Sequence, residues 1–423
     1  MKKYTTTPIS GTTEFLPSTQ AVFDDLKRTI TATYRRHGFL TIETPILERQ
    51  EILLAKAGGD TEKQIYKVFK TSEDPAKSSE ALRFDHTVPL ARYVVEHEQQ
   101  LSFPLKSAQI GQNFRGERAQ KGRFREFYQC DVDVIGRATL PLFYDYDVIS
   151  TLLDAYGSLG LKSPVLARIN NRKIITGLLE ALGLSDKSRD IFSIIDHSEK
   201  VPREKTEQAF QEIGLSPADT AKMLALINLH GPRDKVICNL KNLGLNNPTL
   251  DEGLSELDQT LSLLEQDGYA DRIEADLRIV RGLDYYTGLV FEFVIEDHKD
   301  IGSVGGGGRY DNLATHFTEQ KFPGVGGSIG LSRLFYLLTE HDLLDTEQQR
   351  PLDIAILPLS DAELPYAIEV ARTLRTQGST TTILPSAKSL GARLDSAAKI
   401  AKSAIILGET EATSHTYEIK PLA

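Results

Sequence analysis

The first 136 positions alternate between helical and strand patterns. Over 20–37, apolar residues recur near a helical period, which predicts an amphipathic helix. The segment 38–45 follows as a short strand between a glycine and a proline. Residues 106–115 and 126–136 have strand character on either side of a charged loop. They predict an antiparallel hairpin with a long, basic connection.

The pattern changes between about 171 and 247, where glycine and proline separate leucine- and alanine-rich helical segments. These predicted helices are 172–183, 203–213 and 217–229. Strand patterns then return at 273–281, 285–296 and 325–330, and a helix is predicted over 330–343. We therefore expect a helical insertion that interrupts a first fold, after which that fold resumes.

A different alternation begins after 348–351, which has the composition of a linker. Strands are predicted at 353–358, 380–384 and 404–407, and helices at 362–377 and 389–403. Such alternation is typical of a small α/β domain with a largely parallel sheet. The predicted organisation is a first fold in two parts (1–171 and 249–345), an insertion (172–248) and an α/β domain (351–423).

Composition narrows the class of protein. Hydrophobic residues make up 40% and charged residues 26%, which is ordinary for a soluble globular chain. The two cysteines, Cys130 and Cys238, fit neither a disulfide framework nor a zinc spacing, so a reducing cytoplasm is expected. No long uncharged apolar run or signal-peptide stretch occurs, so no membrane is expected. A net charge of −10 argues against a general nucleic-acid coat protein, but it allows an enzyme with one local basic face.

The loop of the predicted hairpin carries the densest candidate chemistry. Four arginines and a lysine lie within 115–125, interleaved with aromatic residues. Arginine can clamp phosphate oxygens and an aromatic ring can stack on a base, although a solvated charged loop is the common alternative. On the following strand, alternation places Gln129, Asp131 and Asp133 on one face. That face is either part of a polar pocket or a solvent-exposed surface.

Two further segments could contact a small polar ligand. Residues 281–288 place an arginine before paired tyrosines, although strand tyrosines are more often packing residues. The four glycines at 305–308 permit close backbone approach to a ligand, and a flexible hairpin turn is the competing interpretation. The lysine and Ser/Thr of a P-loop are missing from this run.

Two more segments complete the set. The small residues of 324–333 would let a cofactor lie on a strand and let Arg333 cover it, but no ribose-binding acid of a Rossmann unit follows. In 82–89, Asp85 and Thr87 share a face suited to an ammonium group, and His86 is as consistent with a structural role as with a catalytic one. The sequence contains none of the common hydrolase motifs.

Together and in this order, these segments resemble the class II aminoacyl-tRNA synthetases, and specifically the histidyl-tRNA synthetases. Pro45 resembles the first class motif, which builds a homodimer interface, and 115–133 and 326–333 resemble the second and third. Residues 281–288 resemble a motif peculiar to the histidine enzymes and their relatives. The resemblance implies an α+β catalytic domain, with an antiparallel sheet flanked by helices and a helical insertion, and a C-terminal α/β domain of the anticodon-binding type.

The resemblance also implies a site for ATP, which acts as a substrate together with Mg²⁺. Arg115 would hold the α-phosphate and Arg123 the distal phosphates. Glu117 would bind the adenine amino group, and Phe127 and Arg333 would sandwich the adenine ring. No motif indicates which residues would hold a metal ion.

A histidine site is implied beside it. The α-ammonium group would be bound by Asp85, Thr87 and Gln129. The imidazole nitrogens would contact Asp133 and Tyr286, with Tyr285 alongside. Arg281 would be catalytic with Arg115, because it would bridge the substrate carboxylate and the α-phosphate. Asp133 is one methylene shorter than the glutamate of many bacterial members.

The reaction implied is activation of histidine to histidyl-adenylate, followed by transfer to the 3′ end of histidine tRNA. Gln120 and Lys121 would lie in the loop that faces the tRNA. The rival interpretation is the regulatory paralogue of ATP phosphoribosyltransferase, which tends to lose the ATP-site arginines and the C-terminal domain. An RNA-binding module without chemistry is a third and weaker alternative.

Overall fold

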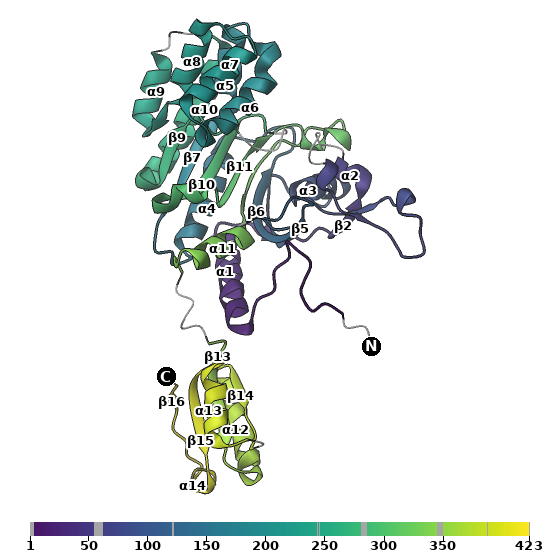
Figure 1. Cartoon of the computed structure of the whole chain (residues 1–423), viewed down its shortest axis with the longest axis vertical. Coiled ribbons are helices and arrows are strands. Elements are labelled where there is room, and N and C mark those ends of the chain that lie inside the picture. Colours follow the sequence, from purple (N-terminus) through teal and green to yellow (C-terminus); the bar gives the residue numbers. More distant parts are fainter. Residues whose placement is uncertain are drawn as a thin grey trace. The chain divides into compact units, whose positions relative to one another are not determined.

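The computed structural model describes residues 4–54, 62–120, 122–242, 244, 246–280, 286–344, 350–386 and 388–422 (Figure 1). The chain divides into two compact units. The larger comprises residues 27–344 and the N-terminal residues as far as Thr13, and the smaller comprises residues 14–26 and the chain from 345 onward. Each unit is described by itself.

A mixed sheet of nine strands forms the centre of the larger unit's described part. In spatial order its strands are β1 (Leu40–Thr41), β5 (Leu105–Phe114), β6 (Glu126–Ile135), β12 (Gly324–Ile329), β11 (Gly305–Tyr310), β10 (Leu289–Ile295), β7 (Val165–Asn171), β9 (Ile273–Asp276) and β8 (His230–Gly231). Neighbouring strands are antiparallel except for β1 with β5 and β7 with β9. The predicted class, an antiparallel sheet flanked by helices, is therefore confirmed, with two parallel pairs near the edges.

Helices cover this sheet and bury its apolar side chains. They are α1 (Pro17–Arg36), of which residues 27–36 belong to this unit, α4 (Phe143–Gly157), α10 (Pro248–Gln266) and α11 (Leu331–Glu340). The Tyr34 hydroxyl of α1 donates to the Cys130 carbonyl of β6 over 2.9 Å, and both residues are buried. Helix α4 packs on β12 so closely that a Cβ at Gly327 would lie 2.7 Å from the Leu152 side chain.

The helical insertion lies at one end of the sheet (Figure 1). Its helices are α5 (Arg172–Ala181), α6 (Ser188–His197), α7 (Arg203–Glu212), α8 (Pro217–Ile227) and α9 (Arg233–Lys241), with 3-10 turns η3 (Ser185–Lys187) and η4 (Ser198–Lys200). Asn171 caps α5 through the Lys173 amide, and Ser216 caps α8 through the Asp219 amide. Strand β8 pairs with β9, so the insertion itself contributes to the sheet.

A small three-stranded sheet stands beside β5 and β6 in the N-terminal part. It contains β2 (Leu47–Arg49), β4 (Glu80–Leu82) and β3 (Lys67–Val68), with α2 (Gln50–Leu54), α3 (Thr87–Glu96), η1 (Glu62–Gln64) and η2 (Pro75–Lys77) nearby. The remaining turns of the larger unit are η5 (Ala270–Arg272), η6 (Glu296–Ile301) and η7 (Leu313–His316). No helix in the described ranges is long and apolar enough to cross a bilayer.

The smaller unit contains a four-stranded sheet in the order β14 (Thr381–Ile383), β13 (Leu352–Pro358), β15 (Ala401–Leu407), β16 (Lys420–Pro421). The first three strands are parallel and the fourth is antiparallel, which confirms the predicted α/β pattern. Alternate residues of β13 enter two apolar clusters: Ile354 and Ile356 pack with α12 (Leu364–Thr376), and Ala355 and Leu357 with α13 (Leu390–Ala398). The short helices η8 (Asp361–Glu363) and α14 (Glu409–Ser414) complete it.

Several predicted boundaries are wrong for reasons of tertiary pairing. The strand predicted over 38–45 is reduced to Leu40–Thr41, because only these residues pair with β5. The helix predicted over 389–403 ends at Ala398, because β15 begins at Ala401, opposite Leu352 of β13. The glycine run at 305–308 is not a hairpin turn, since it lies in β11 between β12 and β10.

Candidate active site

A cavity of about 1250 Å³ lies in the larger unit beside the strands β6, β10, β11 and β12. This volume exceeds the usual range for a single drug-sized ligand and suits two substrates side by side. Seven of the predicted site residues border it: Arg115, Glu117, Arg123, Phe127, Gln129, Tyr286 and Arg333. Arg281, Tyr285 and Lys121 lie outside the described residues.

Two aromatic rings fix the guanidinium of Arg115 at the cavity. It lies 4.4 Å from the Phe84 ring centroid and 5.0 Å from that of Phe127. Its Nε donates to the Phe84 carbonyl over 3.3 Å. A cation held over ring faces loses little further side-chain entropy when it binds an anion, so this arrangement of Arg115 suits an anionic ligand.

Arg333 and Arg123, the other two basic residues predicted for a nucleotide site, differ in how firmly the structure holds them. Arg333 donates to the carbonyls of Ser303 (2.9 Å) and Ile301 (2.8 Å), which orients its guanidinium along the cavity. Arg123 lies at the hairpin tip, where its Nη1 is 3.5 Å from Glu117 Oε2 in an exposed, weak pair. The tip is closed by the Arg123 amide, which donates to the Gln120 carbonyl over 2.9 Å.

The predicted polar face of β6 is a partly buried chain of hydrogen bonds. The Asn113 amide donates to Gln129 Oε1 (2.8 Å), and the Gln129 amide donates to Ser328 Oγ (2.9 Å). Ser328 in turn donates to Asp131 Oδ1 over 2.5 Å. The other Asp131 oxygen lies 3.1 Å from His86 Nδ1. His86 thus has a structural role at the start of α3.

Asp133 continues this face and is 3% exposed, so the alternative of a solvent-exposed surface is wrong. The Tyr310 hydroxyl of β11 donates to Asp133 Oδ1 over 2.8 Å, and the Tyr310 ring lies over Gly324 of the intervening strand β12. A Cβ at Gly326 would lie 2.0 Å from that oxygen, so the close approach requires glycine. Burial raises the pKa of Asp133 to about 8, the charge of Asp131 adds to the rise, and the Tyr310 bond opposes it.

Asp85 is the third carboxylate of this neighbourhood. Its Oδ1 accepts the Val88 amide over 3.0 Å at the first turn of α3. Burial raises the pKa of Asp85, while that hydrogen bond and the charge of Arg115 oppose the rise. Asp85, Thr87 and Asp133 do not border the cavity as described. Asp85, Asp131 and Asp133 form a buried acidic cluster, which Ser328 of the cavity lining contacts by donating to Asp131.

Tyr286 borders the cavity and packs against the cluster of Val88, Ala91 and Tyr310. Its ring would lie 3.0 Å from a Cβ at Gly308, so the glycine run makes room for it on β11. The next residue is anchored by its amide, which donates to the Arg309 carbonyl over 2.8 Å. Arg309 is itself buried and paired with Asp145 of α4. The glycines were predicted to permit a close approach of a ligand to the backbone. At Gly308 it is the Tyr286 ring that makes this close approach.

Residues 11–334 match the family described as histidyl-tRNA synthetase. The chain belongs to the histidyl-tRNA synthetase family. It is 43% identical over 379 residues to the histidine–tRNA ligase of Clostridium tetani, covering 89% of this chain and 84% of the relative. The histidyl-tRNA synthetase of Nostoc sp. PCC 7120 superposes with a TM-score of 0.90 at 34% identity, covering 99% and 95% of the two chains.

A second solved structure shares the fold of this synthetase family. It is described as an ATP phosphoribosyltransferase regulatory subunit/histidyl-tRNA synthetase from Bacillus halodurans. The TM-score is 0.80 at 22% identity, with 96% and 99% of the two chains covered. At this identity the likeness shows the fold alone.

The sequence analysis missed the insertion's contribution to the synthetase cavity. Arg172, Arg189, Phe192 and Lys200 all border it. The Arg172 guanidinium lies 4.8 Å from the Phe192 ring centroid. The helix α6, which carries Arg189 and Phe192, is not among the helices predicted from the sequence, so nothing in the pattern indicated that this part of the insertion borders the cavity.

Proposed function

We propose that this chain activates histidine with ATP and transfers the histidyl group to the 3′ end of histidine tRNA. One observation supports this above the others. On the first side, the buried carboxylates Asp85, Asp131 and Asp133 lie close together behind the lining residue Ser328, which donates to Asp131; on the second, Arg115, Phe127 and Arg333 border the cavity itself. The first side suits a cationic amino acid and the second suits a nucleotide.

In the first step, a carboxylate oxygen of histidine attacks the α-phosphorus of ATP, and pyrophosphate leaves. In the second, a terminal ribose hydroxyl of the tRNA attacks the carbonyl carbon of histidyl-adenylate, and AMP leaves. Arg115, already fixed by two rings, neutralises charge at the α-phosphate, and Arg281 bridges it to the substrate carboxylate. Positioning and preorganised charge therefore supply most of the rate.

The adenine ring is proposed to lie between Phe127 and Arg333, with its amino group on Glu117. Arg123 holds the distal phosphates. The carbonyl contacts of Arg333 support this role, because they orient its planar group at the cavity that Phe127 also borders.

Magnesium fits this site only in company with ATP. No set of three His, Cys, Asp or Glu side chains in the described ranges is grouped as a metal site. Mg²⁺ is usually held by substrate phosphates with one or two carboxylates, and Glu117 and Glu292 are carboxylates that border the cavity. When bound there, the ion would offset phosphate charge.

Histidine specificity is assigned to the buried carboxylates and to the polar residues beside them. Asp85, Thr87 and Gln129 bind the α-ammonium group. Asp133 and Tyr286 contact the two imidazole nitrogens, with Tyr285 alongside. Because Tyr310 occupies Asp133 Oδ1, the second oxygen accepts the ring N–H. A substrate without either nitrogen leaves buried polar groups unpaired, which disfavours it strongly.

The partners follow from the same proposal. The loop with Gln120 and Lys121 faces the tRNA acceptor end, and the α/β unit of 351–423 binds the anticodon. The insertion of 172–248 divides a catalytic domain formed by 1–171 and 249–345. The enzyme acts as a cytoplasmic homodimer that uses the region of Pro45.

The test is ATP–pyrophosphate exchange on purified protein, with each amino acid supplied in turn. Exchange with histidine alone supports the proposal. Absence of exchange with every amino acid would overturn it, and histidine binding that persists without exchange would favour the regulatory paralogue.

A further inference from the structure

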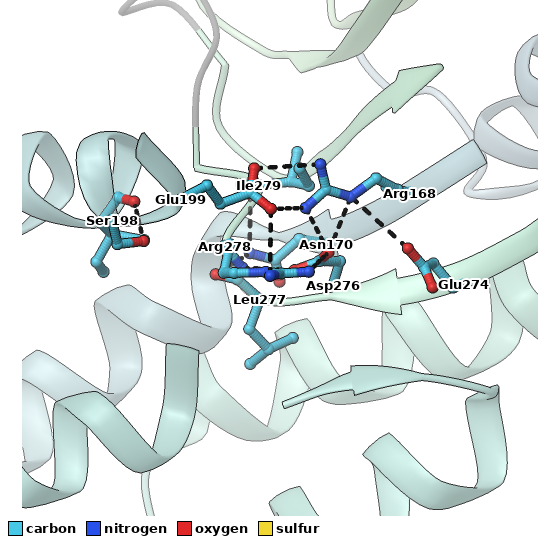
Figure 2. A network of polar contacts seen from close by, with 10 residues as sticks. Arg168, Asn170, Ser198, Glu199, Glu274, Asp276, Leu277, Arg278 and Ile279 are labelled. Atoms are coloured by element: carbon cyan, nitrogen blue, oxygen red, sulfur yellow. Dashed lines mark hydrogen bonds and ion pairs between the residues drawn. The ribbon is translucent and has the colours of Figure 1, made fainter. Parts of the chain in front are cut away.

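The insertion and the catalytic sheet are joined by a buried cluster of charged side chains outside the cavity (Figure 2). Arg168 of β7 donates from Nε and Nη2 to Asp276 Oδ2 at 2.9 and 2.6 Å. The same guanidinium forms a fork with Glu199 of η4, from Nη2 to Oε1 (2.5 Å) and from Nη1 to Oε2 (3.2 Å). Glu199 is therefore the insertion's contribution to this described cluster.

Arg278 closes the cluster from the other side. Its Nε and Nη2 donate to the two oxygens of Asp276 at 2.8 and 2.7 Å, and its Nη1 lies 3.2 Å from Glu199 Oε1. Burial alone would raise the pKa of Asp276, but the bonds from Arg278 and the charge of Arg168 lower it. Asp276 thus stays ionised and both arginines stay oriented.

The segment that follows Asp276 is held from several directions. The Asn170 amide of β7 donates to the Ile279 carbonyl over 2.9 Å, and Arg172 Nη1 of α5 donates to the Val280 carbonyl over 3.2 Å. The Leu277 amide donates to the carbonyl of Leu229, which follows α8 of the insertion. Three separate parts of the insertion, at η4, α5 and the end of α8, therefore anchor 277–280.

This segment leads directly into 281–285, where the proposed function places Arg281 and Tyr285. We propose that Glu199 is a positioning residue for histidine activation, acting through Arg278 and Arg168 on the chain that carries Arg281. Its neighbour Lys200 borders the cavity, so the same 3-10 turn sets both a cavity wall and the anchor. Small displacements of reacting groups are costly in rate, which makes such an anchor consequential.

The charges of this cluster imply that a change at Glu199 affects the orientation of Arg278 without unfolding the protein. Two arginines face three carboxylates, since Glu274 Oε1 also lies 3.7 Å from Arg168 Nε. The Glu199 side chain is 32% exposed, whereas that of Asp276 is fully buried. Replacing Glu199 with glutamine leaves each arginine a carboxylate partner, so the fold should survive while the orientation of Arg278 is relaxed.

The experiment compares Glu199→Gln with Glu252→Gln in histidine-dependent ATP–pyrophosphate exchange. Glu252 of α10 pairs with Lys173 of α5 over 2.9 Å, so the control also removes one carboxylate from an ion pair at the insertion, away from 276–280. We expect kcat/KM for histidine to fall about tenfold in Glu199→Gln, with KM for ATP within about twofold of wild type. Glu199→Asp, which keeps the charge, should recover part of the loss, and Glu252→Gln should match wild type.

The inference rests on the proposed function, and the outcomes separate the two. A wild-type chain without histidine-dependent exchange overturns both. An active wild type with Glu199→Gln indistinguishable from Glu252→Gln overturns the positioning role alone. Equal losses in histidine and ATP parameters together with a lowered unfolding midpoint also overturn it, because they indicate a merely structural role.

Discussion

Asp133 and Asp276 are both buried aspartates next to strands of one sheet, and their surroundings give them opposite properties. Asp276 accepts from Arg168 and Arg278, and its pKa is lowered. Asp133 has the Tyr310 hydroxyl and nearby carboxylates, and its pKa is raised to about 8. The charge of Asp276 is neutralised within the protein and stabilises the structure. The charge of Asp133 is not neutralised by its described contacts, so a cationic substrate is stabilised by binding beside it.

The largest expected effect is on the unfolding free energy, when the charge of Asp276 is removed. Asp276→Asn removes the buried charge shared by Arg168 and Arg278 and leaves them with Glu199, which is partly exposed, and with Glu274, 3.7 Å from Arg168. Loss of one partner in a buried ion pair costs about 3–5 kcal/mol of unfolding free energy. Urea unfolding of wild type and variant measures it, and a loss below about 1 kcal/mol would show that Asp276 is not essential to the cluster.

Arg115→Ala tests the functional half, because Arg115 is the cation whose charge opposes the raised pKa of Asp85. Without it the α-phosphate loses its preorganised partner. We expect the rate of histidyl-adenylate formation to fall by about 10²–10³-fold, with a small change in unfolding free energy. Single-turnover adenylate formation measures the rate, and a near-normal rate would remove Arg115 from the catalytic residues.

Asp133→Asn should affect binding and stability in opposite directions. It removes a buried charge that destabilises the fold but that the substrate requires for binding. A charge-assisted hydrogen bond contributes about 1.5–3 kcal/mol, so KM for histidine should rise by about 10–100-fold. The unfolding midpoint should stay the same or increase. Exchange kinetics at varied histidine provide the measurement, and an unchanged KM would place Asp133 outside the histidine site.

The last prediction concerns the pH dependence of the unfolding free energy. A carboxyl whose pKa is raised on folding contributes stability that is fully present below its unfolded pKa and is lost as pH rises through the folded value. For Asp133 this window runs from about 4 to about 8, with a slope of at most about 1.4 kcal/mol per pH unit. Urea unfolding at pH 5 and pH 8 should show a smaller decline in Asp133→Asn than in wild type; equal declines would contradict the raised pKa.

The pattern of apolar and polar residues was sufficient to predict elements that pair with a neighbour in the sequence. The hairpin of β5 and β6 follows from two alternating segments and one charged loop, and the structure confirms it. The contact of Asp133 with Tyr310 joins residues 177 positions apart, and the Arg168–Asp276 pair joins residues 108 apart. Such contacts depend on strand order in the sheet, which alternation along the chain does not specify.

The same limit applies to the candidate site. Candidate residues were found where residue type indicates chemistry, as at Arg115 and Gln129, and both border the cavity. Glu199 was missed because a single glutamate in a helical, charged segment resembles any solvated residue. Only the approach of η4 to Arg168 and Arg278 gives it a role.

The glycine opposite Asp133 also constrains how this protein can evolve. Positions 133 and 326 are partners across β6 and β12, and a methyl group at 326 would collide with the carboxylate at 133. An alanine at 326 becomes acceptable only after the side chain at 133 has become shorter. Mutational paths that reshape this pocket must therefore change 133 first, so the order of substitutions is restricted as well as their identity.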